Sequence, residues 1–86
     1  MKDKNNIDIY KAFSNENRVR LMVCLSTKQN VTDLLSHCNL SQSALSQHLK
    51  ILKESGFVVC KREGKKQVYG ILNKKALKVA KLLLEL

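Results

Sequence analysis

The stretch that decides the fold is "LSQSALSQHLKILKESG", which runs from Leu40 to Gly56. At 100° per residue, a helix places Leu45, Leu49 and Leu52 on one side. The opposite side carries a row of mostly short polar residues: Ser43, Ser46, Gln47 and Lys50. A solvated helix surface usually favours Glu, Lys and Arg, which pair at four-residue spacing. These four residues therefore indicate a contact with something other than solvent.

Polar residues mark where this helix begins and ends. Ser41 is a good N-cap, Leu40 before it can pack back on the helix, and Gly56 supplies the left-handed residue that ends it. The preceding "VTDLLSHC", residues 31–38, predicts a two-turn helix capped by Asn30 or Thr32. Its inward residues are Leu34 and Leu35. The two helices are then separated by a three-residue turn.

Two further helices are predicted upstream. The first is short, contains Ile7, Ile9, Tyr10 and Phe13, and ends at the polar "SNEN" of residues 14–17, which suits a new N-cap. The second has its apolar side at Val19, Met22, Val23, Cys24 and Leu25 and ends at the polar residues 26–30.

A β-hairpin and a last helix are predicted downstream. Residues 57–63, "FVVCKRE", and 67–72, "QVYGIL", are rich in β-branched and aromatic residues and flank the tight turn "GKK". Asn73 can cap a final helix over residues 74–86. Apolar residues cover nearly every direction of that helix, so a partner is needed to bury them.

Length and charge bound the class of protein. Eighty-six residues make one domain, residues 1–86, without proline or repeats. Residues 1–43 hold six basic and four acidic side chains, net +2, whereas residues 44–86 hold ten and three, net +7. This asymmetry indicates a polyanion facing the second half, and nucleic acid fits better than a membrane. No leader or membrane span is visible, so we expect a cytoplasmic protein.

Catalytic and metal-binding patterns are absent from the sequence. There is no glycine-rich phosphate loop, nucleophile elbow or zinc-protease pair, so an enzyme is not expected, and neither is a cofactor. Cys24, Cys38 and Cys60 lack disulfide or zinc spacing and indicate a reducing compartment. His37 and the adjacent Cys38 point about 100° apart, and His48 lies beside the leucine stripe, so we expect no metal site. Cys24 and Cys38 are retained as candidates for a redox role.

The order of the elements predicts a winged helix-turn-helix, mostly α with a small β-hairpin. In that arrangement the second helix of the pair lies in the DNA major groove, and the hairpin reaches to the phosphates. Short side chains with directional donors and acceptors can read base edges, which explains the polar row. The expected DNA contacts of this helix are Ser41, Gln42, Ser43, Ser46, Gln47 and Lys50, and those of the wing are Lys61, Arg62, Lys65 and Lys66.

Three stretches resemble the ArsR/SmtB family of dimeric bacterial winged-helix regulators. They are "NENRVRLMVCL", "LSQSALSQHLKILKESGFV" and "REGKKQVYGIL", within residues 10–72. The resemblance implies homodimers that clamp promoter DNA and commonly repress until a metal or redox signal releases them. Double-stranded DNA and a second copy of the chain are thus the expected partners.

The chain departs from the sensors of that family. Metal-sensing members carry a Cys-x-Cys pair where this chain has Asn30 and Thr32, and others use Asp and His on the last helix, where residues 74–86 have neither. Thiol-sensing members pair a cysteine of the second helix with one of the last; Cys24 could be the first, but the second is missing. The effector is left open.

Dimerisation is expected through the first and last helices. The interface residues that we expect are Ile9, Tyr10, Phe13, Leu77, Ala80, Leu83 and Leu84. The alternative function is a winged-helix module that docks an acidic protein partner, since fold alone does not fix function.

Overall fold

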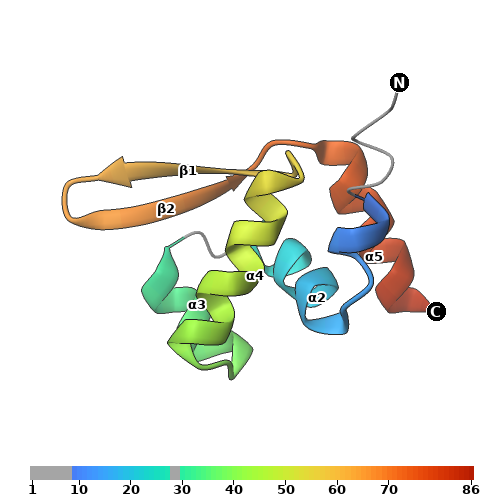
Figure 1. Cartoon of the computed structure of the whole chain (residues 1–86), viewed down its shortest axis with the longest axis horizontal. Coiled ribbons are helices and arrows are strands. Elements are labelled where there is room, and N and C mark those ends of the chain that lie inside the picture. The colour runs from blue at the N-terminus through green and yellow to red at the C-terminus, as the bar shows by residue number, and fades with distance from the viewer. Residues whose placement is uncertain (1–8, 28–29) are drawn as a thin grey trace.

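The computed structural model describes residues 9–27 and 30–86 and has the winged helix-turn-helix architecture that the sequence predicts. Residues 9–12 are helical and precede the named elements. These elements are the helices α2 (Glu16–Cys24), α3 (Val31–Cys38) and α4 (Gln42–Glu54), the strands β1 (Val58–Glu63) and β2 (Lys66–Ile71), and the helix α5 (Lys74–Glu85). The hairpin projects from the helical body at one end of the longest axis, and α5 lies at the other (Figure 1). Ile7 of the predicted first helix lies outside the described residues.

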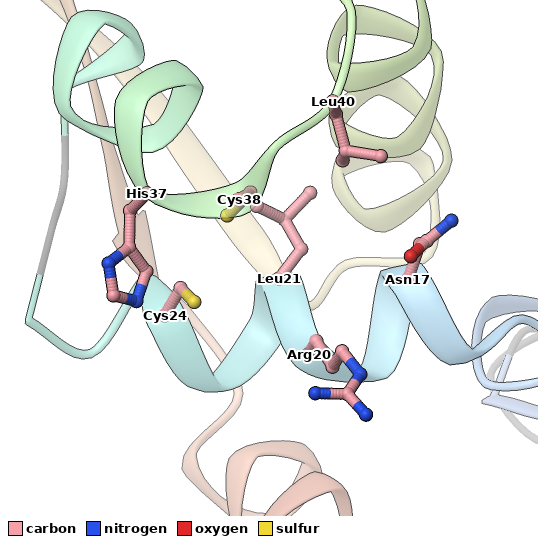
Figure 2. Close-up of a pocket in the computed structure, with 7 residues that line it drawn as sticks. All are labelled: Asn17, Arg20, Leu21, Cys24, His37, Cys38 and Leu40. Atoms are coloured by element: carbon pink, nitrogen blue, oxygen red, sulfur yellow. The ribbon is translucent and has the colours of Figure 1, made fainter.

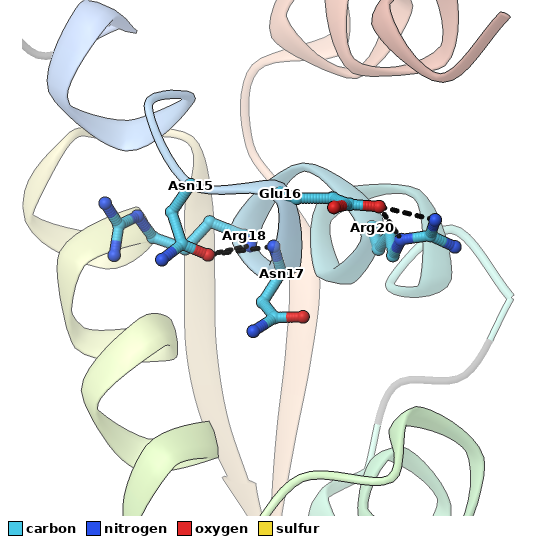
Figure 3. Close-up of polar contacts among 5 residues, drawn as sticks. All are labelled: Asn15, Glu16, Asn17, Arg18 and Arg20. Atoms are coloured by element: carbon cyan, nitrogen blue, oxygen red, sulfur yellow. Dashed lines mark hydrogen bonds and ion pairs between the residues drawn. The ribbon is translucent and has the colours of Figure 1, made fainter.

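Each named helix begins at the polar residue that satisfies its first free backbone amides. The side-chain oxygen of Asn15 accepts from the amide of Asn17 at 2.8 Å and from that of Arg18 at 3.3 Å (Figure 3). Asn30, and not Thr32, caps α3. Ser41 and Asn73 cap α4 and α5 as predicted. The starts of these helices are therefore set by local hydrogen bonds.

Left-handed residues mark two chain reversals and the hairpin turn. Gly56 has φ 79° and ends α4, as predicted. Asn39, with φ 53°, ends α3 in the same way, which the sequence analysis did not foresee. Gly64, with φ 62°, and Lys65 form a two-residue turn, so Lys66 belongs to β2 and not to the turn. Glycine at the first central position favours such a short turn.

The core forms where α2, α4 and α5 meet the base of the hairpin. Its largest fully buried side chains are Leu21, Met22, Leu25, Leu34, Leu45, Leu52 and Val58. Leu21 was not predicted, and Val23 and Leu35 are only half-buried. The small residues Ala76 and Ala80 are fully buried on α5, which packs along α2. This packing leaves the polar side of α4 facing solvent.

We predict that Leu45→Ala lowers the free energy of unfolding by about 2 to 5 kcal/mol, because it removes a fully buried side chain and leaves a cavity. Leu72→Ala is the matched control, since Leu72 is 60% exposed and its truncation should cost well under ~1 kcal/mol. Urea unfolding followed by circular dichroism measures both. Equal losses in the two variants would contradict the assigned core.

Candidate nucleic-acid interface

The polar row of α4 is exposed along its whole length. Ser43, Ser46, Gln47 and Lys50 all face solvent, whereas Leu45, Leu49 and Leu52 on the other side are buried. Gln42, in the first turn, is exposed as well. A side chain that reads a base edge has to be free of internal partners, and no side-chain hydrogen bond within the described part of the chain involves these five residues. The structure thus brings the predicted contacts of this helix onto one open surface.

Ser41 has a structural role beside its predicted contact with DNA. Its hydroxyl oxygen accepts from the amide of Ala44 at 3.1 Å and so caps α4. The hydroxyl hydrogen is still available to donate, because a hydroxyl both accepts and donates. The residue is exposed, so a phosphate oxygen could take that hydrogen bond.

The four cations of the wing do not share one face. Successive residues of a strand point to opposite sides of a sheet, so Lys61 and Arg62 point apart. Arg62 lies opposite Gln67 in the ladder, and Lys61 lies opposite Val68. The sequence pattern identified a basic tip, and the register shows how it divides: Lys66, opposite Glu63, shares the side of Lys61, and Arg62 lies on the other side.

The tip of the wing forms a basic groove with the start of α3. A cavity of about 250 Å³ lies between them, and its lining consists of Asn30, Val31, Thr32, Arg62, Lys65, Lys66 and Gln67. A bridge between Asn30 and Val68 ties the start of α3 to β2. Three cations and no carboxylate line this groove, so it suits a phosphate group. Sequence reasoning missed it because α3 and the wing are about 30 residues apart.

These cations are not engaged by acidic side chains. In residues 9–27 and 30–86, the one ion pair joins Arg20 and Glu16, four residues apart on α2 (Figure 3). Glu63 lies opposite Lys66 in the ladder but forms no ion pair with it. The charge of the wing is therefore available to an external anion.

Arg18 connects the N-terminal helical residues to α4. Its Nε donates to the carbonyl of Ala12 at 2.9 Å, and its Nη2 donates to that of Lys11 at 3.1 Å. Its Nη1 lies 3.3 Å from Nδ1 of His48, which must be unprotonated to accept. Partial burial and the charge of Arg18 both lower the pKa of His48. His48 is thus half-buried against Arg18, a partner that was not foreseen, because the two lie 30 residues apart in the chain.

A small pocket between α2 and α3 contains two of the three cysteines. Cys24 from α2 and Cys38 from α3 line this cavity of about 180 Å³, together with His37 and Arg20 (Figure 2). Burial raises the pKa of the Cys38 thiol to about 11, and the neighbouring Cys24 adds to the effect. From the sequence, Cys24 and Cys38 were separate candidates for a redox role, and the family resemblance placed the partner of Cys24 on the last helix, where this chain has no cysteine. In the structure, the cysteine that neighbours Cys24 is Cys38.

No three His, Cys, Asp or Glu side chains of the described chain gather in a metal-binding arrangement. None of its helices is long and apolar enough to cross a membrane.

The residues predicted for a dimer interface differ in how accessible they are. Tyr10 is 77% exposed, and Leu83 and Leu84 are also exposed, whereas Ile9, Phe13 and Leu77 are half-buried. The rings of Phe13 and Phe57 pack within the protomer, with centroids 5.3 Å apart. Ala80 is fully buried in the core of the protomer, so its inclusion in the interface was wrong. Leu82, which was not among the predicted residues, is 61% exposed.

The fold and the exposed row on α4 define a winged helix-turn-helix protein of the DNA-binding, transcription-regulating class. Residues 15–59 match the family described as bacterial regulatory protein, arsR family. The chain belongs to this family.

Three relatives support the assignment. The chain is 39% identical to the transcriptional activator HlyU of Vibrio cholerae over 62 residues, which are 71% of this chain and 57% of that protein. The structure of reduced HlyU superposes with a TM-score of 0.81 at 32% identity, covering 92% of this chain and 84% of that one. The uncharacterised HTH-type transcriptional regulator MJ1325 of Methanocaldococcus jannaschii is 30% identical over 92% of this chain and 91% of its own length. The transcriptional repressor BigR of Xylella fastidiosa has a TM-score of 0.80 at 29% identity, with 90% and 80% covered.

We predict that Cys38 reacts with iodoacetamide at neutral pH at least about tenfold more slowly than a cysteine in an unstructured peptide, because only the thiolate attacks. The rate should rise as the pH approaches about 11, the pKa of this thiol. Peptide mass spectrometry after timed alkylation measures it at each site. The protein unfolded in urea is the control and should react at the ordinary rate. Fast alkylation of folded Cys38 at pH 7 would contradict the assignment.

Proposed function

We propose that the protein binds duplex DNA sequence-specifically as a homodimer and thereby regulates transcription from sites with two-fold symmetry. The observation that carries this proposal is the open polar row of α4 with its leucine side buried, beside the unpaired basic groove of the wing. Direct reading of bases needs such a row, and phosphate contacts position it.

Gln47 is the residue that we assign to base reading most directly. Its exposed carboxamide has both a donor and an acceptor, which match N7 and the amino group of adenine. Ser43 and Ser46 flank it on the same side and are short enough to let the helix lie close to the base edges. Lys50 has only donors, so we assign it to phosphate or guanine.

The groove between the wing and the start of α3 is the phosphate site that we propose. Arg62, Lys65 and Lys66 line it together, so one backbone segment would meet all three cations. Neutralising phosphates releases counterions, and binding should weaken steeply with salt. Lys61 does not line this groove, so it would contact a different phosphate or none.

Exposed leucines on α5 support the homodimer. Leu82, Leu83 and Leu84 are between 40% and 61% exposed, and Tyr10, in the N-terminal part, is 77% exposed. Apolar surface of this kind is unfavourable in water and favours a partner. A two-fold dimer would place two α4 helices about one DNA turn, ~34 Å, apart.

Repression is the direction that we propose, because a dimer that covers a promoter excludes the polymerase sterically. Among the relatives, HlyU is named an activator and BigR a repressor. A regulator of this kind binds DNA in the cytoplasm and catalyses no reaction. Cys24 and Cys38 stay candidates for a redox role, to be tested by DNA binding before and after oxidation.

The experiment that tests the function is selection of bound sequences from a random duplex pool by the purified protein. We expect an inverted repeat whose half-sites are one turn apart, bound at least ~10³-fold more tightly than random DNA. A module that docks an acidic protein would select no sequence and show no such margin. That outcome at physiological salt would overturn the proposal.

We predict that Gln47→Ala relaxes the sequence preference at one base pair of each half-site, since a bidentate contact is worth about 1 to 3 kcal/mol. Competition binding with single-base variants of the selected site measures the loss. Gln42→Ala, in the first turn, is the control and should leave that base pair unchanged. If Gln47→Ala keeps the same preference and margin, the base-reading role is wrong.

We predict that Lys66→Ala weakens binding to all duplexes alike and reduces the slope of log K against log salt by about 0.9, one phosphate contact. Fluorescence anisotropy at four or more salt concentrations gives the slope. Lys75→Ala removes an equally exposed lysine from α5, away from the wing, and serves as the control. A change in sequence preference, or equal effects of both variants, would count against the groove.

We predict that wild-type protein sediments as a dimer at tens of micromolar and that Leu82→Glu shifts it to monomer, because a buried unpaired carboxylate is costly. Leu72→Glu is the matched control, since Leu72 is 60% exposed and Leu82 is 61% exposed. Analytical ultracentrifugation distinguishes the two states. A monomeric wild type would exclude the homodimer.

A further inference from the structure

A groove lies between the end of α2 and one flank of α5, away from the surface assigned to DNA. Its volume is about 480 Å³, and its lining consists of Leu25, Ser26, Ile71, Lys74, Leu77, Lys78 and Lys81. This volume is within the range of small-molecule sites, about 300 to 1,000 Å³. The tip of the hairpin and α5 lie at opposite ends of the longest axis of the molecule, which spans 39 Å (Figure 1).

The floor of the groove is aliphatic. Leu25 is part of the fully buried core, while Ile71 and Leu77 are half-buried and pack against it. These three side chains come from the end of α2, the end of β2 and the middle of α5. An apolar floor in a concave site favours a ligand with an apolar chain or ring.

The rim of the groove is cationic. Lys74, Lys78 and Lys81 are exposed and follow one another at spacings of four and three residues, which places them on one side of α5. The only ion pair of the described chain is the Arg20–Glu16 pair on α2, so no carboxylate of the described residues, Glu85 on the same helix included, is within ion-pair distance of the three ammonium groups. Like charges at these spacings repel, and an anion between them would relieve that repulsion.

We propose that this groove binds an amphipathic anion, a carboxylate carried on an apolar chain or ring. The apolar part would cover the half-buried Ile71 and Leu77, which lie over the buried Leu25, and the carboxylate would lie among the three lysines. A neutral or cationic amphiphile would gain the apolar contact alone, so the charge of the rim selects the class of ligand.

The groove occupies one flank of α5, and part of the proposed dimer surface points away from it. At 100° per residue, Leu82 and Leu86 point about 140° to 180° away from Leu77. A second copy packed on Leu82 and Leu86 would leave the groove open, whereas Leu84, about 20° from Leu77, borders the groove. A ligand there would touch both α5 and α2, and α2 packs against α4, so it would sit where it could adjust the recognition helix.

The test is titration of the full chain with decanoate below its micelle concentration, using decanol and decyltrimethylammonium as the neutral and cationic probes. Calorimetry should show saturable binding of one decanoate per chain, at least about tenfold tighter than either other probe. Amide and methyl NMR signals of Leu25, Ile71 and Leu77 should shift with the same saturation. This readout requires no DNA, so it separates the ligand site from the proposed DNA-binding function.

The variant Lys78→Glu/Lys81→Glu should weaken decanoate binding at least about tenfold, and Lys75→Glu should not, because Lys75 does not line the groove. Circular dichroism confirms that each variant is folded. Four outcomes would each overturn the proposal: no saturable binding, equal binding of the three probes, equal effects of the two variants, or groove signals that depend on protein concentration and resist decanoate. The last would mean that a second copy covers the groove.

Discussion

Burial of Leu45, Leu49 and Leu52 is the constraint on which the rest of the structure depends. Each buried leucine contributes about 1.5 to 3 kcal/mol, against a net stability of about 5 to 15 kcal/mol for a domain. A helix is rigid, so fixing one side inward fixes the rotation of the whole. The outward direction of Gln47 and its neighbours is therefore a consequence of packing, and the row needs no internal contacts to hold its orientation.

Local features fix where this helix begins and ends, and a long-range contact links it to the N-terminal residues. The cap at Ser41 sets where α4 begins, and Gly56 sets where it ends. Arg18 adds a long-range link, since it joins two carbonyls of the N-terminal helical residues to His48 on α4. The Arg18 side chain thus connects the N-terminal residues, which we expect at the dimer surface, to α4, which we expect in the major groove of DNA.

Eight of the ten basic residues in the second half gather in two places. The sequence attributed the excess of residues 44–86 to one polyanion. In the structure, one set of four cations lies on the hairpin, Lys61, Arg62, Lys65 and Lys66, and another lies on α5, Lys74, Lys75, Lys78 and Lys81. Counterion release acts over short range, so the hairpin set next to α4 is the one placed to hold the DNA backbone. Three residues of the α5 set, Lys74, Lys78 and Lys81, line an apolar groove. A ligand of that groove need not be DNA.

The sequence by itself determined the elements, their caps at Ser41 and Asn73, the glycine turns and the exposed row of α4, because these depend on interactions within about four residues along the chain. It misplaced Ala80 and overlooked Leu21, since burial depends on which side of a helix meets a neighbour. The tertiary structure alone decided the Arg18–His48 contact, the meeting of Cys24 with Cys38, and the two grooves. Each of these features joins residues that lie far apart in the sequence. The packing of the helices brings those residues together, and no local sequence pattern predicts that packing.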